Sequence, residues 1–391
     1  MRALVLPRLA AIVAVAALTG CGSQFELPTE ARTGRTIPPD GSYQMLATWT
    51  GMDGIQDILL TQGSGSQLFL LFNTGGAGTT PRGSVREYSR TTGLAVDQPF
   101  PGLFNPVALC VGNNGRSVGN NAVFVLDQGD TCLARLNPAT QSCDTTGRWG
   151  QRITQLQYFW RVSEHDLFGA AQGGFTDTTM SFVQGITADD RGGVYISGLA
   201  VILLPTTDPR LLERTFEFRV HRYVRGLRSD GTSDPSVLPL GSWHRDTEFE
   251  IRQGTGVGSV VEPRGIHWSG TAGPALFVAD LGNFRAEKVR DGTTPLGTDR
   301  YYHTTDFFGA PALTEPVDVT AEPTGFFFVA DAGGQVLRYE DATRSYVQRV
   351  DVEPNAYGLP LVRPVAVGAD GDLAYVADRG AGQVIRYRRR S

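Results

Sequence analysis

Short apolar runs and short alternating runs follow one another along most of the chain, and they do so in repeats. The three C-terminal copies each begin at a proline, continue into an apolar run that ends in Val-Ala-Asp, and pass through a glycine-containing turn into an alternating run. The apolar runs end at Asp280, Asp331 and Asp378. A run that is apolar throughout predicts a strand buried on both faces, and an alternating run such as 335–339 predicts a strand nearer to solvent. The repeat length of about 50 residues is typical of propeller blades or solenoid units.

Weaker copies of the same pattern lie upstream. They are found at 56–88, at 106–127, and at 184–224, which makes six copies. The sixth copy ends after its third strand, at Arg388, while a strand-like segment at 43–49 precedes the first copy. We therefore predict an all-β fold: a six-bladed β-propeller of four-stranded antiparallel blades, closed by an N-terminal strand that completes the last blade and covers its open edge.

The fourth copy carries the clearest signature. Pro-x-Gly-Ile at 263–266, Val-Ala-Asp at 278–280 and the Asn-x-Arg pair Asn283 and Arg285 resemble the NHL type of β-propeller repeat. The resemblance extends over 43–388 and is strongest in the last three copies. It implies the propeller fold and leaves function open, because such propellers include binding modules and several enzymes.

Two segments are longer than the blade period. The segment 143–180 contains Tyr158, Phe159 and Trp160, and the segment 199–213 contains the apolar run 201–205. We interpret both as candidate partner-binding loops. The alternative is that their apolar residues pack over the blades that they extend.

The N-terminus has the layout of a bacterial export signal. Arg2 and Arg8 precede an apolar run that ends at Leu18, and Leu-Thr-Gly-Cys follows. This tetrapeptide resembles the lipobox of bacterial lipoproteins, which implies a lipid on Cys21 and a membrane as partner. Gly22 in place of an aspartate favours the outer membrane of the cell envelope; the alternative is an ordinary signal peptide with a chance cysteine. We expect a signal peptide at 1–20, a lipidated cysteine and flexible tether at 21–41, and the propeller at 42–391.

Composition and charge limit the classes of partner, and the cysteine count limits the possible disulfide pairings. The chain of 391 residues has 41% hydrophobic and 19% charged residues and a net charge of −5, so it can bury a large core and is not suited to nucleic acid. Beyond Cys21 the cysteines are Cys110, Cys132 and Cys143. Export permits a disulfide, and we prefer Cys132 with Cys143, which flank a turn; the other two pairings stay open.

Candidate site residues lie where the first strand of a copy begins. Asn105, Glu262, Glu315 and Arg363 each precede the opening proline, so we expect them to ring one mouth of the central channel and to bind a polar ligand; the alternative is a solvated polar rim. His267, on an innermost strand, is a further channel candidate or a structural histidine. The recurring aspartates are expected to cap backbone N–H groups.

No catalytic residue, metal or cofactor is expected, because no nucleophile elbow, phosphate loop or His-Glu-x-x-His motif is present. The leading hypothesis is an envelope binding or scaffolding module for an unknown protein or polar ligand. The alternative is a lactonase-like, metal-dependent propeller hydrolase or lyase with one Ca²⁺ or Zn²⁺ in the channel, held by Glu262 and Glu315, with His267 as base.

Overall fold

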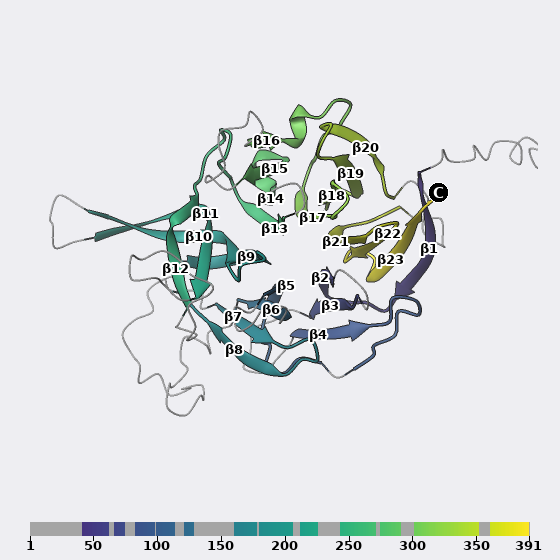
Figure 1. The fold of residues 1–391 in the computed structure, drawn as a ribbon, viewed down its shortest axis with the longest axis horizontal. Helices are drawn as coiled ribbons and strands as arrows, with labels where there is room; N and C mark the ends of the chain where they lie inside the picture. The colour runs from purple at the N-terminus through teal and green to yellow at the C-terminus, as the bar shows by residue number, and fades with distance from the viewer. Residues whose placement is uncertain are drawn as a thin grey trace, which may run out of the picture. The chain divides into compact units, whose positions relative to one another are not determined.

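Six antiparallel sheets are arranged as blades around a central axis in the computed structural model (Figure 1). The structure describes residues 41–61, 66–74, 83–97, 99–113, 121–128, 160–177, 180–205, 212–225, 243–270, 274–290, 301–351 and 360–390. The export signal, the tether, Cys21, Cys132, Cys143, Tyr158 and Phe159 lie outside these ranges. Among the described residues, no helix is long and apolar enough to cross a membrane.

Each blade is built outward from an innermost strand. Blade 1 contains β2 (Ile55–Leu60), β3 (Leu68–Asn73) and β4 (Gly83–Tyr88); blade 2 contains β5 (Pro106–Asn113), β6 (Asn121–Asp127), β7 (Arg161–His165) and β8 (Ala171–Phe175). Blade 3 contains β9 (Met180–Ala188), β10 (Val194–Pro205), β11 (Leu212–Arg225) and β12 (Trp243–Ile251); blade 4 contains β13 (Pro263–Ser269), β14 (Ala275–Asp280), β15 (Arg285–Arg290) and β16 (Tyr301–His303). Blade 5 contains β17 (Pro316–Ala321), β18 (Phe326–Asp331), β19 (Gln335–Glu340) and β20 (Ser345–Arg349); blade 6 contains β21 (Pro364–Asp370), β22 (Leu373–Asp378), β23 (Gln383–Arg389) and β1 (Tyr43–Thr50). Two short 3-10 turns, η3 (Leu281–Asn283) and η4 (Thr304–Asp306), lie in blade 4 and directly after it. The predicted six-bladed propeller is confirmed.

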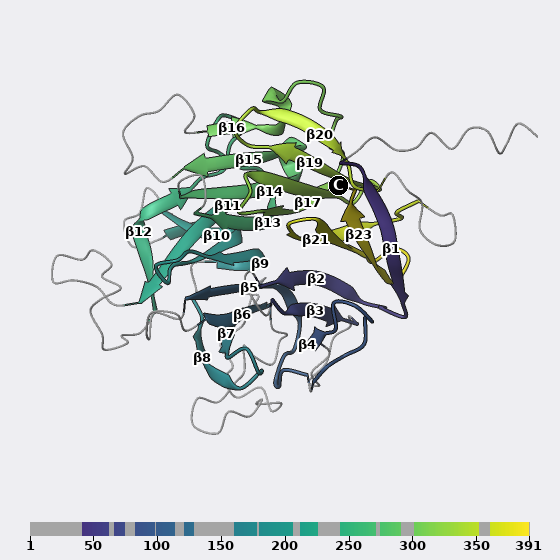
Figure 2. The ribbon, with the colours of Figure 1, turned by 45° about the vertical axis from the view of Figure 1, so that its right-hand side comes forward.

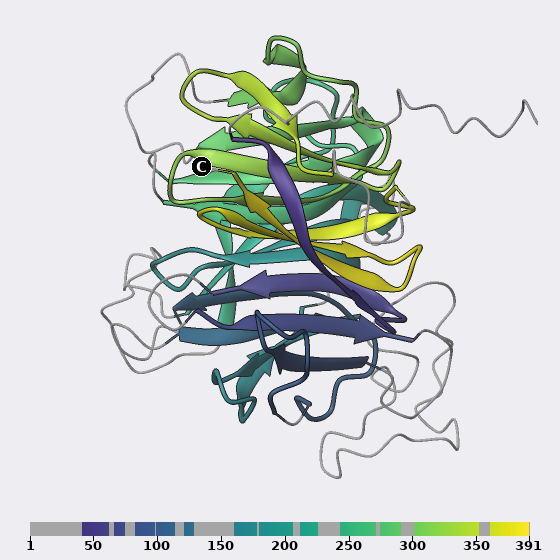
Figure 3. The same cartoon turned by 90° about the vertical axis from the view of Figure 1, so that its right-hand side faces the viewer.

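The first and last strands of the propeller pair with each other, as predicted. β1 runs antiparallel to β23, with Tyr43 opposite Arg389 and Trp49 opposite Val384, so the N-terminal strand is the outer strand of blade 6 (Figure 3). The Trp49 ring lies 5.9 Å from that of Tyr375. The first and last described strands are thereby fixed in one sheet, and the edge of β23 is covered.

Blade 1 differs from the predicted four strands, because its described sheet has three. The fourth place is taken by an irregular segment that gives only isolated bonds to β4: Val96 N–H donates to Glu87 O, and Phe100 N–H donates to Val85 O, both at 2.9 Å. Pro99 and Pro101 lie in this segment and have no N–H to donate. A regular ladder cannot form through them.

The core lies between neighbouring blades. The second strands β14, β18 and β22 are buried along almost their whole length, as predicted for strands covered on both faces. Phe327 of β18 stacks on Tyr339 of β19 and also lies 5.0 Å from the ring of Phe277 in blade 4. Aromatic contacts of this kind hold one sheet against the next.

The two long segments behave differently. Trp160 is fully buried in blade 2, where its indole N–H donates to Met180 O at 3.0 Å, so it packs within the propeller. β10 and β11 pair with each other to Pro205 and Leu212, but β9 pairs with β10 only as far as Ala200. The rest of this hairpin therefore extends away from the ring as a two-stranded ribbon (Figures 1 and 2).

Candidate functional site

Two cavities of about 390 Å³ each lie along the axis of the propeller and are lined mainly by the innermost strands. Both cavities are lined by Asp57, Ala108, Gly265 and Asp318. These four residues therefore mark the level at which the two cavities meet, which we call the waist of the channel. We call the cavity that contains Glu315 the mouth cavity and the cavity that contains His267 the acidic cavity.

Three of the five predicted site residues line the mouth cavity: Asn105, Glu315 and Arg363. The guanidinium of Arg363 donates to the Glu315 carboxylate at 2.6 Å and so links blade 6 to blade 5. The pair is solvent-accessible, with side-chain exposures of 57% and 36%. An exposed pair of this kind contributes little to stability. Its exposure makes both groups accessible to a ligand.

Asn105 belongs to a chain of amide hydrogen bonds around the mouth. The Asn73 amide donates to Asn105 Oδ1, Asn105 donates to Gln128 Oε1 at 3.3 Å, and Gln128 donates to Val183 O at 2.5 Å. The chain connects blades 1, 2 and 3. It fixes the amides at this side of the mouth and uses part of their hydrogen-bonding capacity.

The recurring aspartates hold these residues in place. Each is completely buried, and the carboxylates of Asp127, Asp331 and Asp378 accept the backbone N–H of Asn105, Glu315 and Arg363 at 2.7 to 2.8 Å. The expected capping role is thus present, but most of the capped N–H groups belong to the segment before the innermost strand rather than to the following turn. The repeat motif therefore positions the mouth residues.

Glu262 and His267 lie apart from these three residues. Glu262 has a φ of 71°, does not line the mouth cavity, and forms an ion pair with Arg264, which does line it. His267 lines the acidic cavity instead. Burial lowers the pKa of His267 to about 4, against the effect of a hydrogen bond with the Ala321 backbone, so its imidazole is neutral at pH 7.

Sequence reasoning missed the two carboxyl groups at the waist. Asp57 and Asp318 occupy one repeat position, just after the bulge of their innermost strands in blades 1 and 5. The Leu109 N–H donates to Asp57 at 2.8 Å and the Val367 N–H donates to Asp318 at 2.9 Å, so each carboxylate is held by the next blade. The available signal was the repeat alignment, in which the other four copies have Ala108, Gly185, Gly265 and Ala366 at this position.

The two waist carboxyls affect each other. Burial raises the pKa of Asp318 to about 7. Burial and then the nearby charge of Asp318 raise the pKa of Asp57 well above its ordinary range. The two carboxyl groups therefore titrate as a coupled pair.

The two halves of the channel differ in charge. The lining of the acidic cavity includes four carboxyl groups, Asp57, Asp189, Asp190 and Asp318, and neither lysine nor arginine occurs in its described lining. The mouth cavity contains Arg264, Arg363 and Arg379 besides Glu315. Within the described ranges, no three His, Cys, Asp or Glu side chains are grouped so that they could hold a metal ion.

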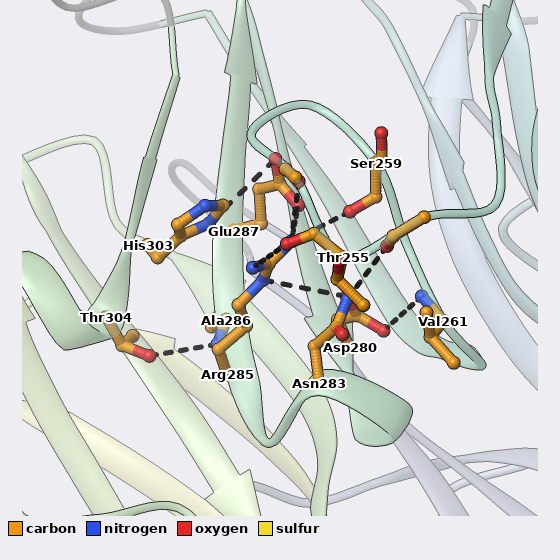
Figure 4. A network of polar contacts seen from close by, with 12 residues as sticks. Thr255, Ser259, Val261, Asp280, Asn283, Arg285, Ala286, Glu287, His303 and Thr304 are labelled. Carbon is orange, nitrogen blue, oxygen red and sulfur yellow. Dashed lines mark hydrogen bonds and ion pairs between the residues drawn. The ribbon is translucent and has the colours of Figure 1, made fainter.

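The residues behind the NHL resemblance form a network away from the waist (Figure 4). The Arg285 guanidinium donates to the carbonyl oxygens of Thr255, Gly256 and Ser259 at 2.9 to 3.0 Å, and Asn283 donates to Asp280 at 2.6 Å. These bonds tie the loop before β13 to β14 and β15. Their role is structural.

The fold defines the chain as a six-bladed β-propeller with a polar axial channel. No family model and no curated protein matches the sequence. Among solved structures, the chain is similar to the PQQ-bound form of an aldose sugar dehydrogenase from Streptomyces coelicolor, with a TM-score of 0.47 and 11% identity over 90% of this chain and 99% of that one. It is also similar to a catalytically inactive virginiamycin B lyase from Staphylococcus aureus with quinupristin, with a TM-score of 0.45 and 9% identity over 89% and 99%. At these values the likeness is one of fold alone.

Proposed function

We propose that this protein is a lipid-anchored binding module of the bacterial cell envelope whose axial channel holds a small polar ligand. The observation that carries the proposal is the channel itself: two cavities that meet at a waist, lined by polar groups that converge from different blades. Concave sites with a few fixed polar groups are the usual form of small-molecule sites. Because neighbouring blades hold these groups by hydrogen bonds, they are fixed before a ligand arrives.

The envelope location rests on the sequence of the first 21 residues. The lipobox resemblance at Leu18–Cys21 supports a lipid on Cys21, and Gly22 favours the outer membrane. A lipid on this residue would hold the propeller at a membrane surface. The NHL resemblance at 263–285 supports the assignment of the blades to that repeat type.

A ligand-class screen tests the proposal. The full chain in detergent is heated with a neutral polyol (glucose), a carboxylate (citrate) or an amine (butane-1,4-diamine), and the melting temperature is followed. A ligand that binds only the folded chain raises the melting temperature in a saturable way. Arg363→Met at the mouth and Thr320→Trp in the acidic cavity are compared with wild type. The proposal is contradicted if no class binds, or if binding survives both channel variants unchanged.

The metal-dependent alternative stays a prediction. Glu262 and Glu315, its proposed ligands, each form an ion pair with an arginine, and His267, its proposed base, lines the other half of the channel from Glu315. No specific contact in the described residues favours this alternative over the binding module.

A further inference from the structure

We infer that the ligand of the channel is a protonated amine, whose ammonium group lies at the waist between the carboxyl groups of Asp57 and Asp318. This inference rests on the proposed channel-binding function and names the chemical class of its ligand. It depends on the geometry of the waist, on the charge of the lining, and on one hydrogen-bond acceptor without a partner.

The waist has acceptors on two blades and space between them. Asp57 and Asp318 each accept one backbone N–H from the adjacent blade and one from the next residue of their own strand, and the remaining lone pairs of each carboxylate are left for a ligand. Small residues at the same level, among them Ala108 and Gly265, line both cavities. An ammonium group has three N–H donors and one positive charge, so it can donate to both carboxyl groups at once.

The side chains that line the acidic cavity also favour a positively charged ligand. The acidic cavity has Asp189 and Asp190 in addition to the waist pair, its described lining contains neither lysine nor arginine, and its histidine is neutral. Asp189 already accepts from Arg222, at 2.7 Å, so the carboxyl groups left for a ligand are chiefly those at the waist. This half of the channel therefore attracts cations and disfavours anions.

A second observation points to a donor on the ligand. Gln184 lines the mouth cavity, and its Oε1 atom is buried and has no hydrogen-bond partner among the described residues. A buried acceptor without a donor is costly. A ligand with N–H groups at both ends could donate to the waist carboxyls at one end and to Gln184 at the other, which favours a diamine over a simple metal cation. Arg264 and Arg363, which also line the mouth cavity, are each paired with a glutamate, and these pairs offset part of the positive charge near the second amine.

The test uses butane-1,4-diamine and butane-1,4-diol, which have the same length and differ in charge. Both are titrated calorimetrically into the full chain in detergent at low salt. We expect the diamine to bind at least about tenfold more tightly than the diol, which follows from hydrogen bonds to charged groups. Equal affinity for the two compounds would overturn the inference.

Two isosteric variants test the waist directly. Asp57→Asn and Asp318→Asn keep an acceptor for the backbone N–H and remove the charge, so each is expected to fold and to lose about tenfold or more in diamine affinity. Asp372→Asn, at an exposed position in the turn between β21 and β22 that lines neither cavity, is the control and should change the affinity less than about threefold because solvent screens its charge. Unchanged diamine affinity in both waist variants would contradict the inference.

Gly265→Ala tests the position of the Asp318 carboxyl group without changing its charge. A Cβ atom at residue 265 would lie 2.5 Å from Asp318 Oδ1 and 2.6 Å from Asp318 Cα, so the carboxyl group and the strand that carries it must both move, and diamine affinity should fall. The outcomes separate the two proposals. A neutral or anionic ligand that Thr320→Trp excludes, with no amine binding, would overturn this inference and support the channel function. Calcium binding with diamine excluded would also overturn it, and no binding of any class would contradict the channel function itself.

Discussion

Asp280 and Asp331 occupy the same repeat position in blades 4 and 5, yet the pKa of Asp280 is raised to about 6 while that of Asp331 is lowered. Burial raises the pKa in both cases. Asp331 offsets this effect by accepting from the Gln335 side chain at 2.8 Å and from three backbone N–H groups, including that of Glu315. Asp280 accepts the N–H of Val261 rather than that of Glu262, and fewer donors surround it. Stronger desolvation of Asp280 and the larger number of donors around Asp331 together give the two carboxyl groups shifts of opposite sign.

These opposite pKa shifts predict unequal losses of stability on substitution at pH 7. Asp331→Asn should lower the free energy of unfolding at pH 7 by about 2–4 kcal/mol, because buried N–H groups lose a charged acceptor. Asp280→Asn should cost less, because at pH 7 the wild-type carboxylate is ionised above a raised pKa. Urea unfolding of both variants at pH 7 measures the difference, and a larger loss for Asp280→Asn would contradict the explanation.

The pH dependence of the same variants follows from the sign of each shift. Since the folded pKa of Asp331 lies below its unfolded value of about 3.9, its contribution is present above that pH and is lost as the pH falls further. The folded pKa of Asp280 lies above its unfolded value, so stability declines as the pH rises from about 4 to 6. Asp280→Asn should remove this decline, and Asp331→Asn should remove the loss in acid. Unfolding free energies measured from pH 3 to 7 test both statements.

Much of the fold could be predicted because its signal is local and repeated. The apolar runs ending in Val-Ala-Asp identify β14, β18 and β22, and the incomplete sixth copy predicts the closure of blade 6 by β1. The position of Glu315 and Arg363 at one mouth also follows from the repeat. The irregular edge of blade 1 was missed, because two prolines interrupt the fourth strand without changing the repeat length.

The waist pair could not be predicted in the same way. Asp57 and Asp318 come from blades 1 and 5 and meet only when the ring closes. In the sequence each is a single aspartate at a position that otherwise contains alanine or glycine, and this exception is visible only after six imperfect copies have been aligned. Their mutual effect on pKa depends on burial in the channel, which no local pattern reports.

The hydrogen bonds of Arg285 predict that its substitution will loosen the loop before β13. Its guanidinium donates to three carbonyl oxygens of residues 255–259 as a planar fork, which a lysine ammonium cannot reproduce (Figure 4). Arg285→Lys should therefore lower the free energy of unfolding by roughly 2–3 kcal/mol. It should also speed hydrogen exchange of the Gly254 and Val260 amides, which bond within this loop. Arg252→Lys, a mostly exposed neighbour, is the control and should leave exchange unchanged.

The raised pKa of Glu287 predicts that the folded protein loses stability toward alkaline pH. Burial raises its pKa to about 7, although Arg285 and the Gly258 N–H oppose the shift. The folded state therefore favours the protonated form, and stability falls as the pH rises from about 4 to above 7. Glu287→Gln should reduce this fall by roughly 2–3 kcal/mol between pH 5 and 8, as the shift implies. An identical pH slope in the variant and the wild type would show that Glu287 does not ionise in this range.

The lipid expected on Cys21 predicts that the protein is held at a membrane. If the cysteine receives a lipid, Cys21→Ser should move the full chain from the membrane fraction to the soluble fraction of an expressing bacterium and should abolish labelling by radioactive palmitate. Cys110→Ser, at the buried thiol on β5, is the matched control, because removal of that thiol leaves the anchor intact. Membrane retention of Cys21→Ser without palmitate label would show that another part of the chain binds the membrane.

Closure of the ring through β1 predicts a large effect of a short deletion. Removal of residues 42–50 would uncover β23 and the faces of Phe328 and Tyr375, which contact Tyr43 and Trp49. Loss of two buried aromatic residues and a strand ladder should lower the melting temperature by roughly 5 °C or more. Thr50→Ala, at the exposed end of β1, should have little effect.

A synthetic peptide of residues 42–50 should restore the melting temperature of the truncated chain, because the edge of β23 remains available for pairing. A peptide of the same composition in scrambled order is the control, and rescue by the native peptide alone would show that the truncated chain lacks only the closing strand. An unchanged melting temperature after the deletion would contradict the closure.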